Sequence, residues 1–198
     1  MSTAAIQHGQ AEQEWRQPSK GVIGMTCLII AESAIFTIFV VAYLFYIGRD
    51  TSGPTPKQVL EIPWFYSVCL LSSSLFIVLA EHAIEHGKMV AFRLWWLITM
   101  ALGAIFLYGT AAEWRKLIVE DHLTISTNLF GTTYYALVGL HASHVIAGLL
   151  MMTVTAVFSL TGALRPAHAK RVKVLALYWH FVDAVWIVVF TVVYWIGR

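Results

Sequence analysis

The longest stretch of this chain without Asp, Glu, Lys or Arg includes all residues from Leu123 to Leu164. The hydrocarbon core of a bilayer is about 30 Å thick, and a helix of about 20 apolar residues crosses it. At about 1.5 Å per residue, a helix made of most of this stretch would outrun that core. We therefore expect a membrane-spanning helix here that tilts or projects beyond the membrane.

The composition indicates the same class of protein. Hydrophobic residues make up 59% of the chain and charged residues only 12%, whereas a soluble domain typically has about 25% charged residues. This leaves too little polar surface to cover a water-soluble globule, so we expect an integral membrane protein. The net charge of +2 gives no indication of nucleic-acid binding. Cys27 and Cys69 lie inside apolar runs and are expected to behave as small hydrophobic side chains.

Five apolar segments account for nearly the whole chain, which predicts an all-α bundle of five transmembrane helices. Residues 1–20 are polar and are expected to form a cytoplasmic tail, because they contain no apolar core typical of a signal peptide or a span. Residues 21–198 are expected to form a single transmembrane domain. Its helices are predicted over residues 21–48, 63–86, 92–114, 128–162 and 174–196.

The distribution of basic residues predicts that the N-terminus is cytoplasmic and the C-terminus lies outside. With this orientation the inner segments carry eight Lys and Arg residues and the outer segments carry five. Most of the excess comes from the loop over residues 165–173. The prediction rests on the excess of Lys and Arg in the cytoplasmic loops of membrane proteins.

Ionisable side chains inside the apolar segments are the first candidates for a functional site. Such groups are costly in hydrocarbon and are expected to face protein or water. Counted from the inner surface, Glu32 lies at a depth of about 16 Å and Asp183 at about 15 Å. His141 and His144 fall in the same layer, and His180 lies close to Asp183 in the last segment. These five residues form the predicted intramembrane polar cluster.

The first-helix face around Glu32 is apolar, so a partner for this carboxylate must come from another helix. His141 and His144 are three residues apart and project from one face of the fourth helix. We predict a hydrogen bond or ion pair between Glu32 and one of these histidines. Asp183 is predicted to bond separately to a neighbour of its own.

His82 and His86 permit a metal interpretation. With Glu81 and Glu85 they superficially resemble a di-iron box, because histidines four residues apart share a helix face. However, they lie near the inner membrane boundary, away from the deeper histidines of the fourth helix. We favour a helix end that faces solvent or lipid head groups, and we expect no metal site.

The same boundary contains a predicted phospholipid site. Arg93 and His86 can hold an anionic head group through charge-assisted hydrogen bonds, while aromatic side chains beside them line its acyl chains. The residues assigned to this site are His82, His86, Arg93, Trp95 and Trp96.

Two C-terminal motifs resemble a known family. Residues 178–186, Tyr-Trp-His-Phe-Val-Asp-Ala-Val-Trp, closely resemble the last-helix signature of subunit III of the haem-copper respiratory oxidases. Residues 139–148, Gly-Leu-His-Ala-Ser-His-Val-Ile-Ala-Gly, resemble the signature of the preceding helix. The segment around Glu32 is similar to the family's helix with the carbodiimide-reactive carboxylate, and the likeness covers residues 21–197.

The resemblance implies a function for the whole chain. It implies an accessory, cofactor-free and non-catalytic subunit of a proton-pumping terminal oxidase in aerobic respiration, with haem and copper in partner subunits. Such a subunit packs on the catalytic subunit I, binds phospholipid and supports proton uptake. The long form of the family has seven helices, so the five predicted here resemble the short form of the bacterial cytoplasmic membrane.

Two alternatives to this function stay open. The analogous subunit of nitric oxide reductases shares the fold. From a different class, a membrane di-iron oxygenase would use the histidines as metal ligands.

Overall fold

The computed structural model describes residues 19–49 and 53–197, and these residues form helices joined by turns, with no strand. This confirms the predicted all-α class. All but the last two residues of the predicted tail, 1–20, lie outside the described residues. The elements are α1 (Lys20–Tyr46), α2 (Pro56–Val59), α3 (Trp64–Glu85), α4 (Met89–Val119), α5 (Leu129–Leu160), the 3-10 helix η1 (Pro166–His168), α6 (Ala169–Phe190) and the π-helical η2 (Thr191–Ile196).

Within the described ranges, five helical segments are long and apolar enough to cross a membrane, as predicted. Four of them are α1, α3, α4 and α5. The fifth runs from Pro166 to Ile196 and consists of η1, α6 and η2. α5 has 32 residues, which at about 1.5 Å per residue is longer than a bilayer core.

α4 is longer at both ends than the apolar pattern predicts. It runs from Met89 to Val119, whereas the pattern covers only residues 92–114. Arg115 and Lys116 end the apolar run but not the helix, because long basic side chains can carry their charge to the interface while the backbone stays helical. The last turn of α4 therefore continues toward the loop.

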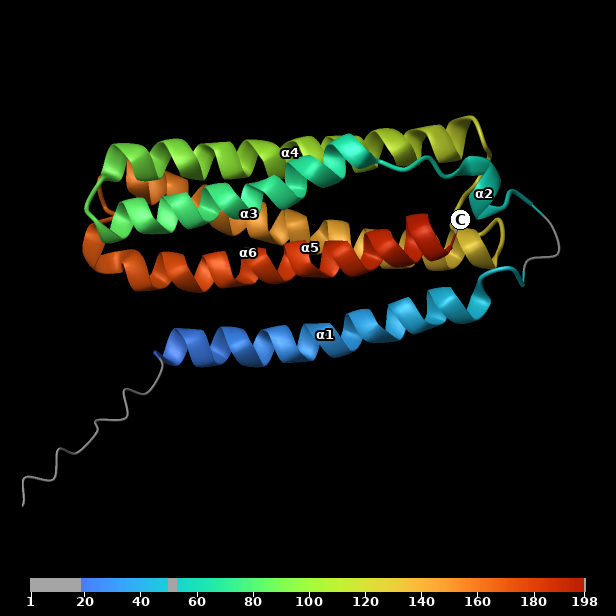
Figure 1. Cartoon of the computed structure of the whole chain (residues 1–198), viewed down its shortest axis with the longest axis horizontal. Helices are drawn as coiled ribbons and strands as arrows, with labels where there is room; N and C mark the ends of the chain where they lie inside the picture. The colour runs from blue at the N-terminus through green and yellow to red at the C-terminus, as the bar shows by residue number, and fades with distance from the viewer. Residues whose placement is uncertain (1–18, 50–52, 198) are drawn as a thin grey trace, which may run out of the picture.

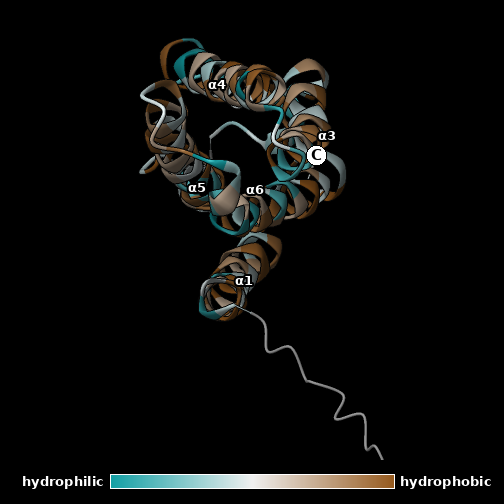
Figure 2. Cartoon of the chain, turned by 90° about the vertical axis from the view of Figure 1, so that its left-hand side faces the viewer, coloured by the Kyte–Doolittle hydropathy of each residue, from teal (hydrophilic) through white to brown (hydrophobic). Residues whose placement is uncertain are grey.

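α1 lies at one edge of the bundle. Figure 1 shows the long helices side by side along the longest axis of the molecule, and the end view in Figure 2 places α3, α4, α5 and α6 around a common centre with α1 outside them. α1 contacts α5 and α6 and buries only Phe36 and Tyr43. Most of its surface is exposed and apolar, which suits a helix that faces lipid.

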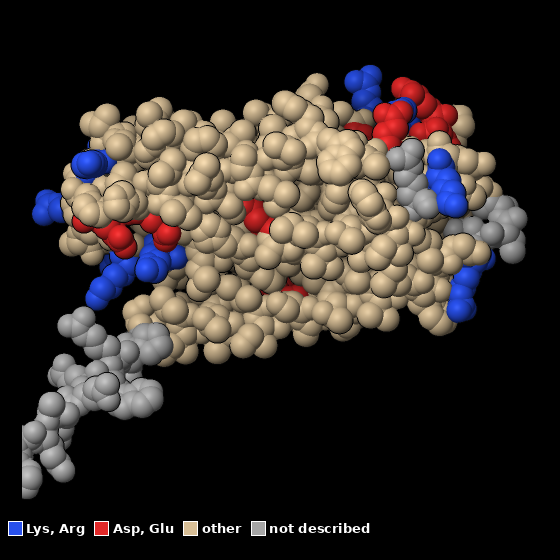
Figure 3. Space-filling model, viewed as in Figure 1, with Lys and Arg blue, Asp and Glu red and all other residues tan. Residues whose placement is uncertain are grey.

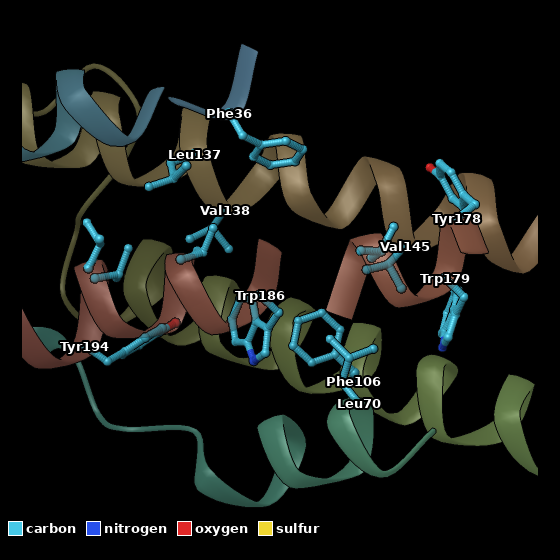
Figure 4. Packing of buried hydrophobic residues seen from close by; sticks show 14 of the residues in the cluster. Phe36, Leu70, Phe106, Leu137, Val138, Val145, Tyr178, Trp179, Trp186 and Tyr194 are labelled. Carbon is cyan, nitrogen blue, oxygen red and sulfur yellow. The ribbon is translucent and has the colours of Figure 1, made fainter. Parts of the chain in front are cut away.

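Trp179 joins the four helices of the core. It lies on α6, is fully buried, and donates a hydrogen bond from Nε1 to Ser73 Oγ on α3 over 2.7 Å. Gly103 on α4 and Gly148 on α5 lie against its indole, and a Cβ atom at either position would come within 2.8 or 2.7 Å of the ring. Figure 4 shows the indole among the other buried side chains. The two glycines therefore allow these helices to approach each other closely around the tryptophan.

The charged side chains gather at the two ends of the molecule (Figure 3). Between the ends, the surface in this view is largely free of charge, as expected for a band that lies in hydrocarbon. Acidic atoms also show near the middle of this band, far from either end. Carboxylates at this depth need partners, and the contacts of Glu32 and Asp183 show what those partners are.

Candidate functional site

Glu32 and His144 form a contact between α1 and α5. Glu32 Oε2 lies 3.2 Å from His144 Nε2, and the two side chains are 23% and 14% exposed. The depth of these residues predicted a contact between Glu32 and one of two histidines, and the structure identifies His144 as that histidine. The pair attaches the peripheral helix α1 to the core of the bundle.

The second contact of His144 limits how the pair can be protonated. Nδ1 lies 2.8 Å from the carbonyl oxygen of Leu140, so Nδ1 carries the proton, because a carbonyl only accepts hydrogen bonds. Nε2 then either accepts a hydrogen bond from a protonated Glu32 or, as an N–H, donates one to the carboxylate. Both arrangements share one proton and have no net charge. A neutral pair is far less costly in hydrocarbon than an isolated charge.

His141 takes no part in this pair. Its ring is fully buried and stacks on Trp186 with 4.9 Å between centroids. Phe36 and Phe106 flank the same ring, and Figure 4 shows both of these side chains and Trp186. Neither ring nitrogen of His141 has a hydrogen-bond partner among the described residues. His141, which was predicted to lie in the same layer as Glu32, is therefore surrounded by aromatic rings instead of polar partners.

Asp183 and His180 meet Ser74 on the neighbouring helix α3. Ser74 Oγ donates a hydrogen bond to Asp183 Oδ2 and lies 3.1 Å from His180 Nδ1. Asp183 is almost fully buried, and its Oδ1 has no partner within the described part of the chain. Asp183 thus has a neighbour of its own, as predicted, but the sequence did not identify Ser74 as that neighbour.

A third polar group, outside the predicted cluster, lies near the C-terminal end of α4 and in η2. Tyr194 donates its hydroxyl to Glu113, with 3.0 and 2.8 Å to the two carboxylate oxygens. The hydroxyl of Tyr134 on α5 lies 3.5 Å from that of Tyr194. The predicted third span ended at residue 114, which placed Glu113 at a boundary. Because α4 continues to Val119, this carboxylate lies inside the helix.

The residues of the predicted phospholipid site lie where α3 ends and α4 begins. His82 and His86 are exposed and their rings lie 4.1 Å apart, centroid to centroid. Arg93 is half-buried, and it donates from Nε to Ser159 Oγ over 3.2 Å and from Nη2 to the Ser159 carbonyl over 2.6 Å. Part of the guanidinium therefore bonds to the end of α5.

Trp95 and Trp96 have different environments. Trp95 is half-buried and stacks on Phe76 at a centroid distance of 5.7 Å. Trp96 is only 1% exposed and donates from Nε1 to the Met152 carbonyl over 3.0 Å. The expectation that Trp96 lines acyl chains is wrong, because its side chain points into the bundle.

Comparison with known proteins identifies the family of this chain. The family model for "Cytochrome c oxidase subunit III" matches residues 8–198. The chain belongs to this family. A cytochrome c oxidase subunit 3 from Synechocystis sp. is 36% identical to it over 194 residues, which cover 94% of this chain and 80% of that protein.

Two further subunit III relatives cover similar lengths. A cytochrome c oxidase subunit 3 from Alkalihalophilus pseudofirmus is 33% identical over 177 residues, covering 88% of this chain and 86% of the relative. A cytochrome bo(3) ubiquinol oxidase subunit 3 from Pseudomonas aeruginosa is 33% identical over 181 residues, covering 89% of this chain and 85% of the relative. The bacterial relatives and the five apolar helices identify a multi-pass bacterial membrane protein.

In the subunit III family of haem-copper oxidases, the cofactors lie in other subunits. In this chain, no group of three or more His, Cys, Asp or Glu side chains within residues 19–49 and 53–197 is arranged to hold a metal ion. His82 and His86 contact each other and lack the additional ligands of a di-iron site in that part of the chain.

Proposed function

We propose that this chain is the accessory third subunit of a haem-copper terminal oxidase, packed on the catalytic subunit of the complex. The observation that carries the proposal is the match of the subunit III family over residues 8–198. The names of the relatives support it, because they include subunits of a cytochrome c oxidase and of a ubiquinol oxidase. In this role the chain carries no redox centre of its own, and it supports proton uptake and the lifetime of the haem-copper centre.

The polar groups within the membrane support a role beyond that of a spacer. Ionisable residues in transmembrane helices are costly and are usually functional. Glu32 pairs with His144 on α5, and Asp183 bonds to Ser74 on α3. These contacts fix the positions of α1 and α6 in the bundle. In our proposal they thereby maintain the shape of the surface that contacts the catalytic subunit.

Phospholipid binding at the inner membrane boundary is part of the proposal. Arg93 keeps its Nη1 free of hydrogen bonds to the described residues, and His82 and His86 are exposed. These groups suit an anionic head group, and the half-buried Trp95 suits the acyl region.

The proposal is tested by isolating the chain from native membranes in a mild detergent through an affinity tag. We expect chains that bear haem and copper to co-purify in fixed ratio, while this chain alone contains no iron. Deleting its gene should leave the haem spectrum of the oxidase unchanged but shorten the lifetime of its activity during turnover. Stoichiometric iron in the isolated chain, or purification without any haem-bearing partner, would contradict the proposal.

A further inference from the structure

The outward stripe of α6, between α3 and α1, carries a polar group at mid-membrane. Ala184 and Ile187 on this stripe are exposed, and His180 one turn away is half-buried. On the adjacent helix α3, Leu71 and Val78 are exposed on either side of Ser74. These residues form one surface, which we call the α3–α6 face. Figure 1 shows the two helices side by side, and the contacts between Ser74 and α6 agree.

The Nε2 atom of His180 has no hydrogen bond to any described residue. The ring's contact with Ser74 uses Nδ1, and Nε2 is not among the buried polar atoms that lack a partner. It therefore reaches the molecular surface. Ser74 Oγ gives its only hydrogen to Asp183, so His180 Nδ1 donates to Ser74, and Nε2 of the neutral imidazole presents a lone pair that needs a hydrogen-bond donor.

This position makes an unpaired nitrogen costly. His180 lies well inside α6, whose apolar run spans the membrane. No water or head group is available in the hydrocarbon core, so a polar group without a partner there is strongly unfavourable. Ionisable side chains at this depth face protein or a water-filled cavity. Lipid tails are therefore a poor neighbour for the α3–α6 face.

Exposed hydroxyls on α5 show a different pattern. Ser143 and Thr153 donate to the carbonyls of Leu140 and Leu149 on their own helix, over 2.6 and 2.7 Å. A hydroxyl satisfied in this way can face lipid, because its hydrogen bond stays within the helix. The imidazole of His180 has no such local partner for Nε2.

We propose that the α3–α6 face is the surface on which the catalytic subunit docks, through a transmembrane helix that offers a hydrogen-bonding side chain to His180 Nε2. Ala184 is exposed one turn beyond His180 on α6, and this small side chain allows a second helix to approach closely beside the imidazole. This inference rests on the proposed function, since it requires a membrane partner, and it adds which face that partner covers.

The first test is photo-crosslinking in the intact, tagged complex. A photoreactive amino acid replaces Val78 or Ile187 on the α3–α6 face, or Ile146 or Leu150 on the exposed side of α5 as controls; all four are exposed. We expect adducts with the haem-bearing chain from the first two positions. Adducts with lipid only, with a second copy of this chain, or with the haem-bearing chain from the α5 positions alone would overturn the inference.

The same experiment separates this inference from the proposed function. If haem-bearing chains co-purify but crosslink elsewhere, the function stands and the assigned face is wrong. If no haem-bearing chain co-purifies, the function itself fails.

Two substitutions test the role of Nε2. A glutamine amide reaches about as far as Nε2 and an asparagine amide about as far as Nδ1, so His180→Gln keeps the outward contact and His180→Asn keeps only the contact with Ser74. We expect retention of this chain by the complex, measured as subunit per haem after detergent washing, to fall about fivefold in His180→Asn and to stay near the original value in His180→Gln. An equal loss in both variants, or none in either, would place the role of His180 inside this chain and overturn the inference.

Discussion

Glu32 contacts Nε2 of His144, whose Nδ1 donates to the Leu140 carbonyl. Removing one partner leaves the other as an unmatched polar group at mid-membrane, whereas removing both leaves two apolar side chains in contact. The energetic cost of each substitution therefore depends on whether the partner is still present.

We predict that Glu32→Leu or His144→Leu alone lowers the free energy of unfolding by about 1–3 kcal/mol. The double variant should lose less than the sum of the two single variants. Unfolding of the purified subunit in detergent, followed by circular dichroism, measures all three. Additive losses would mean that the two side chains do not interact.

Gly148 illustrates how closely two helices meet around one indole. A Cβ atom there would come within 2.7 Å of the Trp179 ring, whereas a Cβ atom at Gly24 on α1 would meet nothing within 4 Å. We predict that Gly148→Ala destabilises the subunit by about 1–3 kcal/mol. The matched variant Gly24→Ala should be neutral or slightly stabilising, because alanine favours helix. Equal thermal unfolding midpoints for the two variants would refute this packing.

Arg93 joins the start of α4 to the end of α5, because its guanidinium bonds to Ser159. One nitrogen of this side chain remains for a ligand outside the bundle. Arg93 thus has a structural contact with Ser159 and, in our proposal, a second contact with lipid. Substitutions of Arg93 and of Ser159 can distinguish the effects of these two contacts.

We predict that Arg93→Ala weakens retention of anionic phospholipid about tenfold, since hydrogen bonds to charged groups are among the stronger ones. Ser159→Ala is the control, because Ser159 is 1% exposed and cannot reach lipid. Mass spectrometry of lipid bound after detergent washing compares the two. The same lipid loss in Ser159→Ala would assign the effect to the helix end instead of the head group.

Across the molecule as a whole, the basic residues visible in Figure 3 lie at the two ends, and the long helices alternate in direction (Figure 1). The inner end, in our proposal, is the one that contains the loop from η1 into α6 with its basic residues, since cytoplasmic loops are rich in Lys and Arg. This assignment places the end of η2 outside.

The orientation can be measured with reporter fusions. We predict that a reporter active only outside the cytoplasmic membrane is active when fused after Arg198 and inactive when fused after Gly162. Activity with the reverse pattern would invert the orientation and would move the proposed lipid site to the outer leaflet.

Which residues lie at the same level of the bundle could be predicted from the sequence alone. Each residue of a helix rises about 1.5 Å, so counting residues placed Glu32 level with the histidines of the fourth helix, and Glu32 contacts His144. For the same reason the apolar runs predicted the all-α class and the spans. The signatures over residues 139–148 and 178–186 identified the family.

The side of its helix on which each side chain meets a neighbour was decided only by the tertiary structure. His141 and His144 are about 60° apart around α5, and the position of α1 determines that His144 meets Glu32 while His141 contacts Trp186. Trp96 faces the core for the same reason. Ser74 carries no charge, so nothing in the sequence marked it as the residue that joins Asp183 to His180. The rise of a helix is a local property of the chain, whereas its rotation is set by which helices pack against it.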